Sequence, residues 1–104
     1  MAIKSIDLPE EFTSAMNQPA AVIKIYTPDC KDCAEVKPKY KEFAQDKKYR
    51  HITFYQANYQ QLGQICNQHN VVYTPAFLFC KHGVVKHNVV TSKRSEIRQG
   101  LDML

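Results

Sequence analysis

Two cysteines separated by two residues are the feature of this sequence best suited to chemistry. They are Cys30 and Cys33, in the stretch Tyr26-Thr27-Pro28-Asp29-Cys30-Lys31-Asp32-Cys33. At this spacing two thiols can close a small disulfide ring with little backbone movement, so the pair can alternate between dithiol and disulfide. The sequence therefore predicts a redox-active pair. The alternative is two buried cysteines that have no chemical role.

The segments on either side place these sulfurs where a strand meets a helix. Residues 20–26 form an apolar, β-branched run typical of a buried strand. From Cys33 onward, apolar residues recur at helical spacing, and Pro38 lies inside that helix. A helix N-terminus stabilises a thiolate, which is the reactive form of cysteine. We therefore expect Cys30, nearer the start of the helix, to be the nucleophile and Cys33 to be the resolving thiol.

Strand and helix patterns alternate along the rest of the chain. Strands are predicted at 2–6, 52–57, 76–80 and 84–90. A helix is predicted at 8–17 with a capping box of Asp7 and Glu10, and two later helices follow apolar stripes at 62–69 and 97–104. This order predicts an α/β fold with a central mixed sheet and helices on both of its faces. Ligands bind such sheets beyond the carboxyl ends of the strands, where the cysteine pair lies.

The remaining cysteines, Cys66 and Cys80, are too far along the chain for a zinc finger or ribbon with the first pair. Cys66 lies on an inward helical stripe, which predicts a small core residue. Cys80 ends a strand, and we expect it to be half exposed. The sequence therefore indicates no metal site.

Length and composition limit the class of protein. The 104 residues predict one domain, 1–104, and 44% hydrophobic residues argue against disorder. The three glycines form no phosphate-binding loop, and the net charge of +4 accompanies no nucleic-acid motif. The start lacks an apolar signal region, and no apolar segment approaches membrane-spanning length. We expect a cytoplasmic monomer without nucleic-acid or membrane partners.

Over essentially its whole length the chain resembles the thioredoxin family. The resemblance is carried by the C-x-x-C at 30–33, Pro38 five residues beyond it, Thr74-Pro75 before an aromatic strand, and Gly83 in the last hairpin. It implies a thioredoxin-like fold in which Pro75 is cis and faces the disulfide. It also implies a substrate groove, whose expected residues are Tyr26, Asp29, Lys31, Asp32, Tyr73 and Thr74.

The chain also departs from that family. The usual W-C-G-P-C core reads Asp29-Cys30-Lys31-Asp32-Cys33, so the tryptophan, glycine and proline are absent. Lys24 stands where the family has a buried acid, and Tyr55 stands where the resemblance places that acid's lysine partner. Buried, Lys24 could exchange a proton with Cys33 or hold its thiolate; alternatively, its stem reaches solvent or an acid.

These features predict an oxidoreductase that reduces protein disulfides through Cys30 and Cys33. It would need no bound cofactor, and the resemblance implies re-reduction by a flavin-dependent reductase or by glutathione. The alternative is a binding module that holds a partner in the groove beside Pro75 without turnover. An oxidase or isomerase is a third reading, disfavoured by the absence of a leader.

Overall fold

The computed structural model describes residues 3–104, and its elements follow the predicted order of strands and helices. The elements are β1 (Lys4–Ile6), α1 (Pro9–Met16), β2 (Ala21–Tyr26), α2 (Lys31–Gln45), the 3-10 helix η1 (Lys47–Tyr49), β3 (Thr53–Asn58), α3 (Tyr59–Gln68), β4 (Ala76–Lys81), β5 (Val84–Val90) and α4 (Arg94–Leu101). Within residues 3–104, no helix has the length and apolar character needed to cross a membrane.

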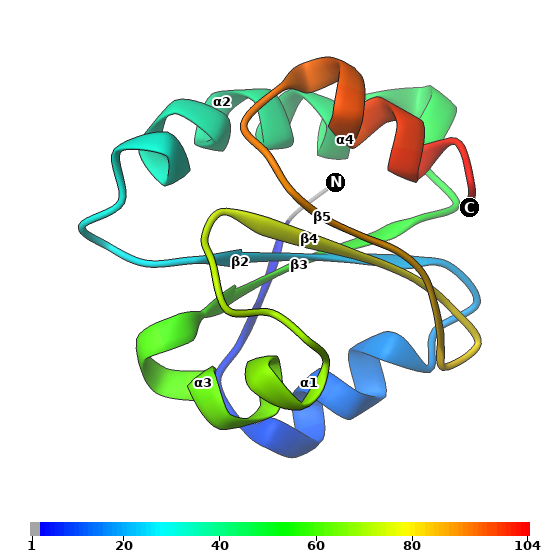
Figure 1. The fold of residues 1–104 in the computed structure, drawn as a ribbon. Coiled ribbons are helices and arrows are strands. Elements are labelled where there is room, and N and C mark those ends of the chain that lie inside the picture. Colours follow the sequence, from blue (N-terminus) through cyan, green and yellow to red (C-terminus); the bar gives the residue numbers. More distant parts are fainter. Residues whose placement is uncertain (1–2) are drawn as a thin grey trace.

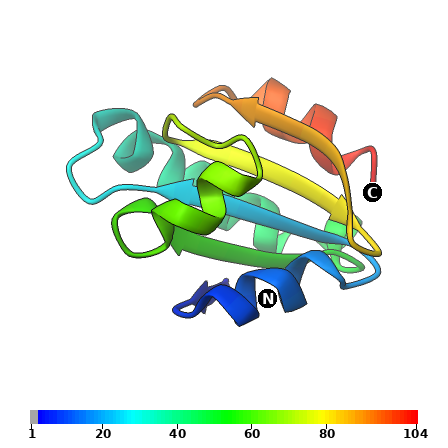
Figure 2. The same cartoon turned by 60° about the horizontal axis from the view of Figure 1, so that its bottom comes forward.

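The five strands form one mixed sheet in the order β1-β3-β2-β4-β5. β3 pairs in parallel with both β1 and β2, whereas β4 is antiparallel to β2 and β5. Figure 2 shows β2 between β3 and β4. β2 thus lies in the interior of the sheet, and because helices cover both faces there, its residues are apolar almost without interruption. In register, Lys24 lies opposite Gln56 of β3 and Phe77 of β4.

Helices cover both faces of the sheet, as the sequence predicted. α2 and α4 lie on one face, and α1 and α3 lie on the other (Figure 1). Alternate residues of the central strands divide between the two cores: Val22 packs with α2 and α4, whereas Ile23 packs with α1 and α3. The mixed sheet with its two helical layers confirms the predicted fold class.

Two local predictions were wrong, one about the start of α1 and one about the exposure of Cys80. The capping box does not use Asp7 and Glu10; instead the Glu11 carboxylate accepts hydrogen bonds from the Asp7 and Leu8 amides, each at 2.9 Å. The helix begins at Pro9, which has no amide proton to satisfy.

Cys80 is fully buried, with 0% exposure, rather than half exposed. It pairs with Ala21 and Val85 in the sheet and packs in the core beneath α1. Cys66 is buried in the same core, as predicted. Burial raises the pKa of both thiols to about 11, so neither is a ready thiolate at neutral pH.

Candidate functional site

The turn from β2 into α2 holds the two sulfurs together. β2 ends at Tyr26, and Cys30 is the N-cap residue of α2. Cys30 and Cys33 are joined as a disulfide. The backbone N–H of Cys33 donates to Cys30 Sγ at 3.1 Å. A sulfur in this position accepts a hydrogen bond from a backbone amide and lies at the positive end of the helix dipole. The fold therefore favours negative charge on Cys30 once the disulfide is reduced.

The two cysteines differ in their access to solvent. Cys30 is partly exposed, whereas Cys33 is only 6% exposed and packs inside the first turn of α2. An incoming disulfide therefore meets Cys30 first. This difference follows from the helix, because Cys30 precedes it and Cys33 lies on its inward face.

The segment before β4, the strand that pairs with β2, approaches Cys30. The Thr74–Pro75 peptide bond is cis, and Cys30 Sγ lies 3.7 Å from the Thr74 carbonyl oxygen. The hydroxyls of Thr27 and Thr74 are 3.4 Å apart, which ties this segment to the turn after β2. Residues 27–30 and 74–75 thus meet around one sulfur.

The other expected groove residues lie at the surface near this point. Tyr26 is half-buried, and Asp29, Lys31 and Asp32 are exposed. Tyr73 is 71% exposed. Its neighbour Val72 is also exposed, although the sequence analysis did not select it.

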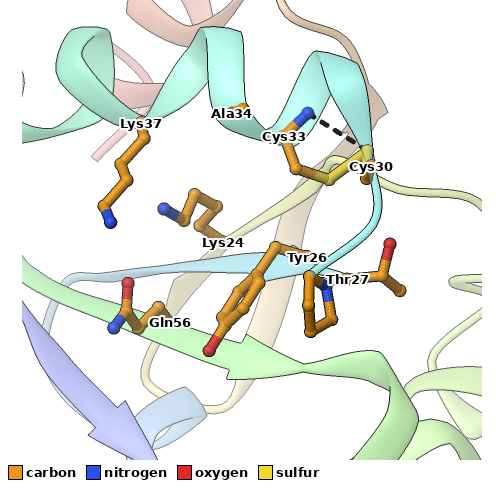
Figure 3. A pocket seen from close by; sticks show the side chains of 9 residues that line it. Lys24, Tyr26, Thr27, Cys30, Cys33, Ala34, Lys37 and Gln56 are labelled. Carbon is orange, nitrogen blue, oxygen red and sulfur yellow. Dashed lines mark hydrogen bonds between the residues drawn. A yellow bond between two sulfur atoms is a disulfide. The ribbon is translucent and has the colours of Figure 1, made fainter.

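A pocket of about 240 Å³ opens beside the disulfide. Its lining residues are Lys24, Tyr26, Thr27, Pro28, Cys30, Cys33, Ala34, Lys37 and Gln56 (Figure 3). Of the predicted site residues, it brings together only Lys24, Tyr26 and the two cysteines.

Lys24 is buried in the sheet and reaches this pocket. The residue is 4% exposed. Its Nζ lies 5.5 Å from the centre of the Tyr26 ring and 5.1 Å from that of Tyr40, so two aromatic rings contact the ammonium. Burial, followed by repulsion from Lys37, lowers the pKa of Lys24 to about 8.

The position of Tyr55 corrects the expectation drawn from the resemblance. Tyr55 packs against the core formed with α1 and α3, on the opposite face of the sheet from the core that contains Tyr40. The β3 residue that faces Lys24 is Gln56. Adjacent strand residues point to opposite faces, so a displacement of one residue changes the partner completely.

Lys37 and Gln56 are site residues that the sequence analysis missed. Lys37 follows Cys33 by four residues on α2, and this helical spacing was the available signal. Gln56 had no comparable signal, because its place depends on the pairing of β2 with β3.

The thioredoxin family model matches residues 5–103. The chain belongs to the thioredoxin family. Thioredoxins are thiol–disulfide oxidoreductases, and this member keeps the C-x-x-C pair although it lacks the usual residues between and before the cysteines.

The chain is 27% identical over 73 residues to thioredoxin H3 of Arabidopsis thaliana. That match covers 70% of this chain and 60% of the relative, so the chain spans less than two thirds of the plant protein.

Solved thioredoxin structures share the fold. A thioredoxin of Malassezia sympodialis superposes with a TM-score of 0.90 at 18% identity, covering 98% of this chain and 90% of that one. A structure from a study of thiol resolution in a yeast mitochondrial 1-Cys peroxiredoxin via glutathione/thioredoxin systems gives 0.90 at 19% identity, covering 99% and 96%.

Proposed function

We propose that this thioredoxin-family protein, acting as one domain of residues 1–104, reduces disulfide bonds in protein substrates in the cytoplasm. The observation that carries the proposal is the Cys30–Cys33 disulfide at the start of α2, where Cys30 Sγ accepts a hydrogen bond from a backbone amide and Cys30 borders solvent. The family membership supports the same reaction class.

The reaction proceeds by two thiol–disulfide exchanges. The Cys30 thiolate attacks one sulfur of the substrate disulfide, forms a mixed disulfide and releases the other substrate sulfur as a thiolate. The Cys33 thiolate then attacks Cys30 Sγ, restores the Cys30–Cys33 disulfide and releases the second substrate sulfur. Two electrons pass to the substrate, and both released thiolates take protons from solvent or from nearby groups.

The substrate is held beside Cys30 in this proposal. The Thr74 carbonyl oxygen, 3.7 Å from Cys30 Sγ, would accept a hydrogen bond from an extended substrate backbone, and Pro75 would keep that segment against the disulfide. Tyr26, Tyr73 and the charged residues Asp29, Lys31 and Asp32 would border the bound chain. A flavin-dependent reductase or glutathione would return electrons to the oxidised protein.

Lys24 acts on the second step. At pH 7 its amine is mostly protonated, because its pKa is about 8. A positive charge in the pocket shared with Cys33 stabilises the resolving thiolate. Lys24 thus acts through Cys33, by stabilising its thiolate. It occupies the position at which the family has a buried acid.

Reduction of insulin disulfides by dithiothreitol, with and without the protein, tests the proposed reaction. We expect the wild-type protein to accelerate precipitation of the insulin B chain above the rate with dithiothreitol alone, and Cys30→Ser to abolish that acceleration. Tyr59→Phe, which changes an exposed hydroxyl on α3, serves as the folded control. If the wild-type protein gives no acceleration, a binding role without turnover replaces this proposal.

A further inference from the structure

The pocket beside the disulfide contains two lysines and no acid. Lys24 and Lys37 are the charged residues among those that line it, since the two cysteines are joined in a neutral disulfide. Across residues 3–104, neither lysine forms a salt bridge. By contrast, Lys39 on the same helix lies 3.6 Å from the Glu35 carboxylate. The pocket thus concentrates positive charge that the fold leaves unpaired.

This arrangement costs free energy in the absence of an anion. A buried ammonium without a carboxylate partner loses hydration, and the rings of Tyr26 and Tyr40 offset only part of that loss. Lys37 adds repulsion and contributes to the lowered pKa of Lys24. Figure 3 shows both lysine side chains extending into the same space. A negative charge placed in this space would offset both the lost hydration of Lys24 and its repulsion from Lys37.

The other residues that line the pocket also suit a bound carboxylate. Gln56 lines the pocket and offers amide protons, while Cys30 and Cys33 form another wall (Figure 3). The volume of about 240 Å³ is smaller than pockets that enclose a whole drug-sized ligand, roughly 300–1,000 Å³. It has room for one side-chain-sized group of a larger molecule whose disulfide lies at Cys30.

We propose that Lys24, Lys37 and Gln56 form an anion site that binds a carboxylate of the disulfide substrate. The inference rests on the proposed function and adds a substrate class, acidic disulfides. The carboxylate remains bound while Cys30 Sγ bonds to one substrate sulfur and the other leaves as a thiolate. It can belong to a small acidic disulfide or to an acidic side chain next to a cystine in a protein.

The charge preference is measured with three small disulfides. The reduced protein is mixed with 3,3′-dithiodipropionate, bis(2-hydroxyethyl) disulfide or cystamine, which carry negative, no and positive charge. Each rate is divided by the rate of the same disulfide with dithiothreitol, to remove intrinsic reactivity. We expect the normalised rate to be highest for the acidic disulfide, and Lys37→Met to lower the acidic-to-neutral ratio about five- to tenfold.

Lys41→Met is the matched control. Lys41 lies one turn beyond Lys37 on α2, is exposed and does not line the pocket, so this variant removes the same charge from the surface. Its acidic-to-neutral ratio should equal that of the wild type. Lys24→Met should lower the ratio as Lys37→Met does. A wild-type ratio in both Lys24→Met and Lys37→Met, or an equal fall in Lys41→Met, would overturn the anion site.

A second pair of probes distinguishes the sources of the carboxylate. Two short peptides, each a mixed disulfide and differing only in Glu or Gln beside the cysteine, are reduced by the same variants. A Glu preference that depends on Lys37 indicates protein substrates, whereas dependence confined to 3,3′-dithiodipropionate indicates small acidic disulfides. Either result supports the anion site. If the rates depend on Lys37 in neither set of probes, the anion site is refuted.

Binding without turnover separates the anion site from the proposed reaction. The disulfide form is titrated with propionate and with its neutral analogue propionamide while backbone amide NMR shifts are followed. We expect saturable shifts around Lys37 and Gln56 with propionate alone. If the wild-type protein reduces none of the disulfides, the proposed reaction fails while this titration still decides the site; an absence of saturable propionate shifts would refute the site.

Discussion

Cys30 and Cys33 occupy different environments although only two residues separate them. Cys30 caps α2 and borders solvent, and its Sγ accepts a hydrogen bond from the Cys33 backbone N–H, with nitrogen and sulfur 3.1 Å apart. Cys33 is buried in the first turn and shares its pocket with Lys24. These environments suit successive roles, one sulfur meeting the substrate and the other closing the ring.

Trapping of mixed disulfides tests this division of roles. We expect Cys33→Ser to accumulate a stable mixed disulfide with substrate through Cys30, because the second exchange is blocked. Cys30→Ser should trap at most a few per cent as much, since Cys33 is buried. Non-reducing electrophoresis and mass spectrometry measure the adducts. The opposite pattern would show that Cys33 is the nucleophile.

A change at Lys24 should alter the second exchange. In Lys24→Met the ammonium that stabilises the Cys33 thiolate is absent, so we expect resolution at pH 7 to slow by about three- to tenfold. The difference should narrow above pH 8, where wild-type Lys24, with its pKa of about 8, loses its charge. Stopped-flow resolution of a preformed mixed disulfide gives the profile.

Alkylation of Cys30 is the control for that measurement, and it should change less than resolution does. If the resolution profile is the same in wild type and Lys24→Met from about pH 6 to 9, a range that spans the Lys24 pKa of about 8, Lys24 is structural and its proposed role is wrong.

Helix α2 is attached to the sheet by a buried hydroxyl as well as by apolar packing. The Tyr40 hydroxyl lies 2.6 Å from the Tyr55 carbonyl oxygen and 3.2 Å from that of Val22. These carbonyls belong to β3 and β2, so one side chain links the helix that carries the cysteines to two strands. Burial raises the pKa of Tyr40 well above its ordinary value, which keeps the hydroxyl a donor.

Removal of that hydroxyl should destabilise the fold. We expect Tyr40→Phe to lower the free energy of unfolding by about 1–2 kcal/mol, because the strand carbonyls lose a buried donor while the ring remains. Denaturant unfolding at pH 7 measures the change. Tyr59→Phe removes a more exposed hydroxyl and should cost less than about 0.5 kcal/mol. Equal effects of the two substitutions would contradict a special role for Tyr40.

The stability of the molecule as a whole should report the burial of Lys24. Its pKa is about 8 in the folded protein, compared with 10.5 for an ordinary lysine. Between these values the unfolded chain binds more protons, so this residue makes stability rise with pH. Below pH 8 the residue is charged in both states, and the full cost of burial is present.

Lys24→Met should therefore be more stable than the wild type at pH 7, by about 1–2 kcal/mol when solvent access through the pocket is taken into account. The advantage should shrink as the pH rises from 8 toward 10.5. Denaturant unfolding of the disulfide form measures both, and Lys41→Met accounts for loss of surface charge. A difference that stays constant with pH would show that Lys24 titrates normally.

Local patterns in the sequence predicted the order of elements and the place of the cysteine pair. The apolar run before Cys30 and the helical spacing after Cys33 each depend on neighbouring residues, so they can be interpreted without a partner segment. The burial of Cys66 followed from its helical stripe in the same way.

Only the tertiary structure decided what surrounds these residues. The pairing of β2 with β3 makes Gln56, not Tyr55, the neighbour of Lys24. The placement of β4 between β2 and β5 buries Cys80. The packing of α2 over the sheet brings Lys37 to the pocket of Lys24. Strand register and helix position arise from contacts between segments distant in sequence, and local periodicity carries no information about them.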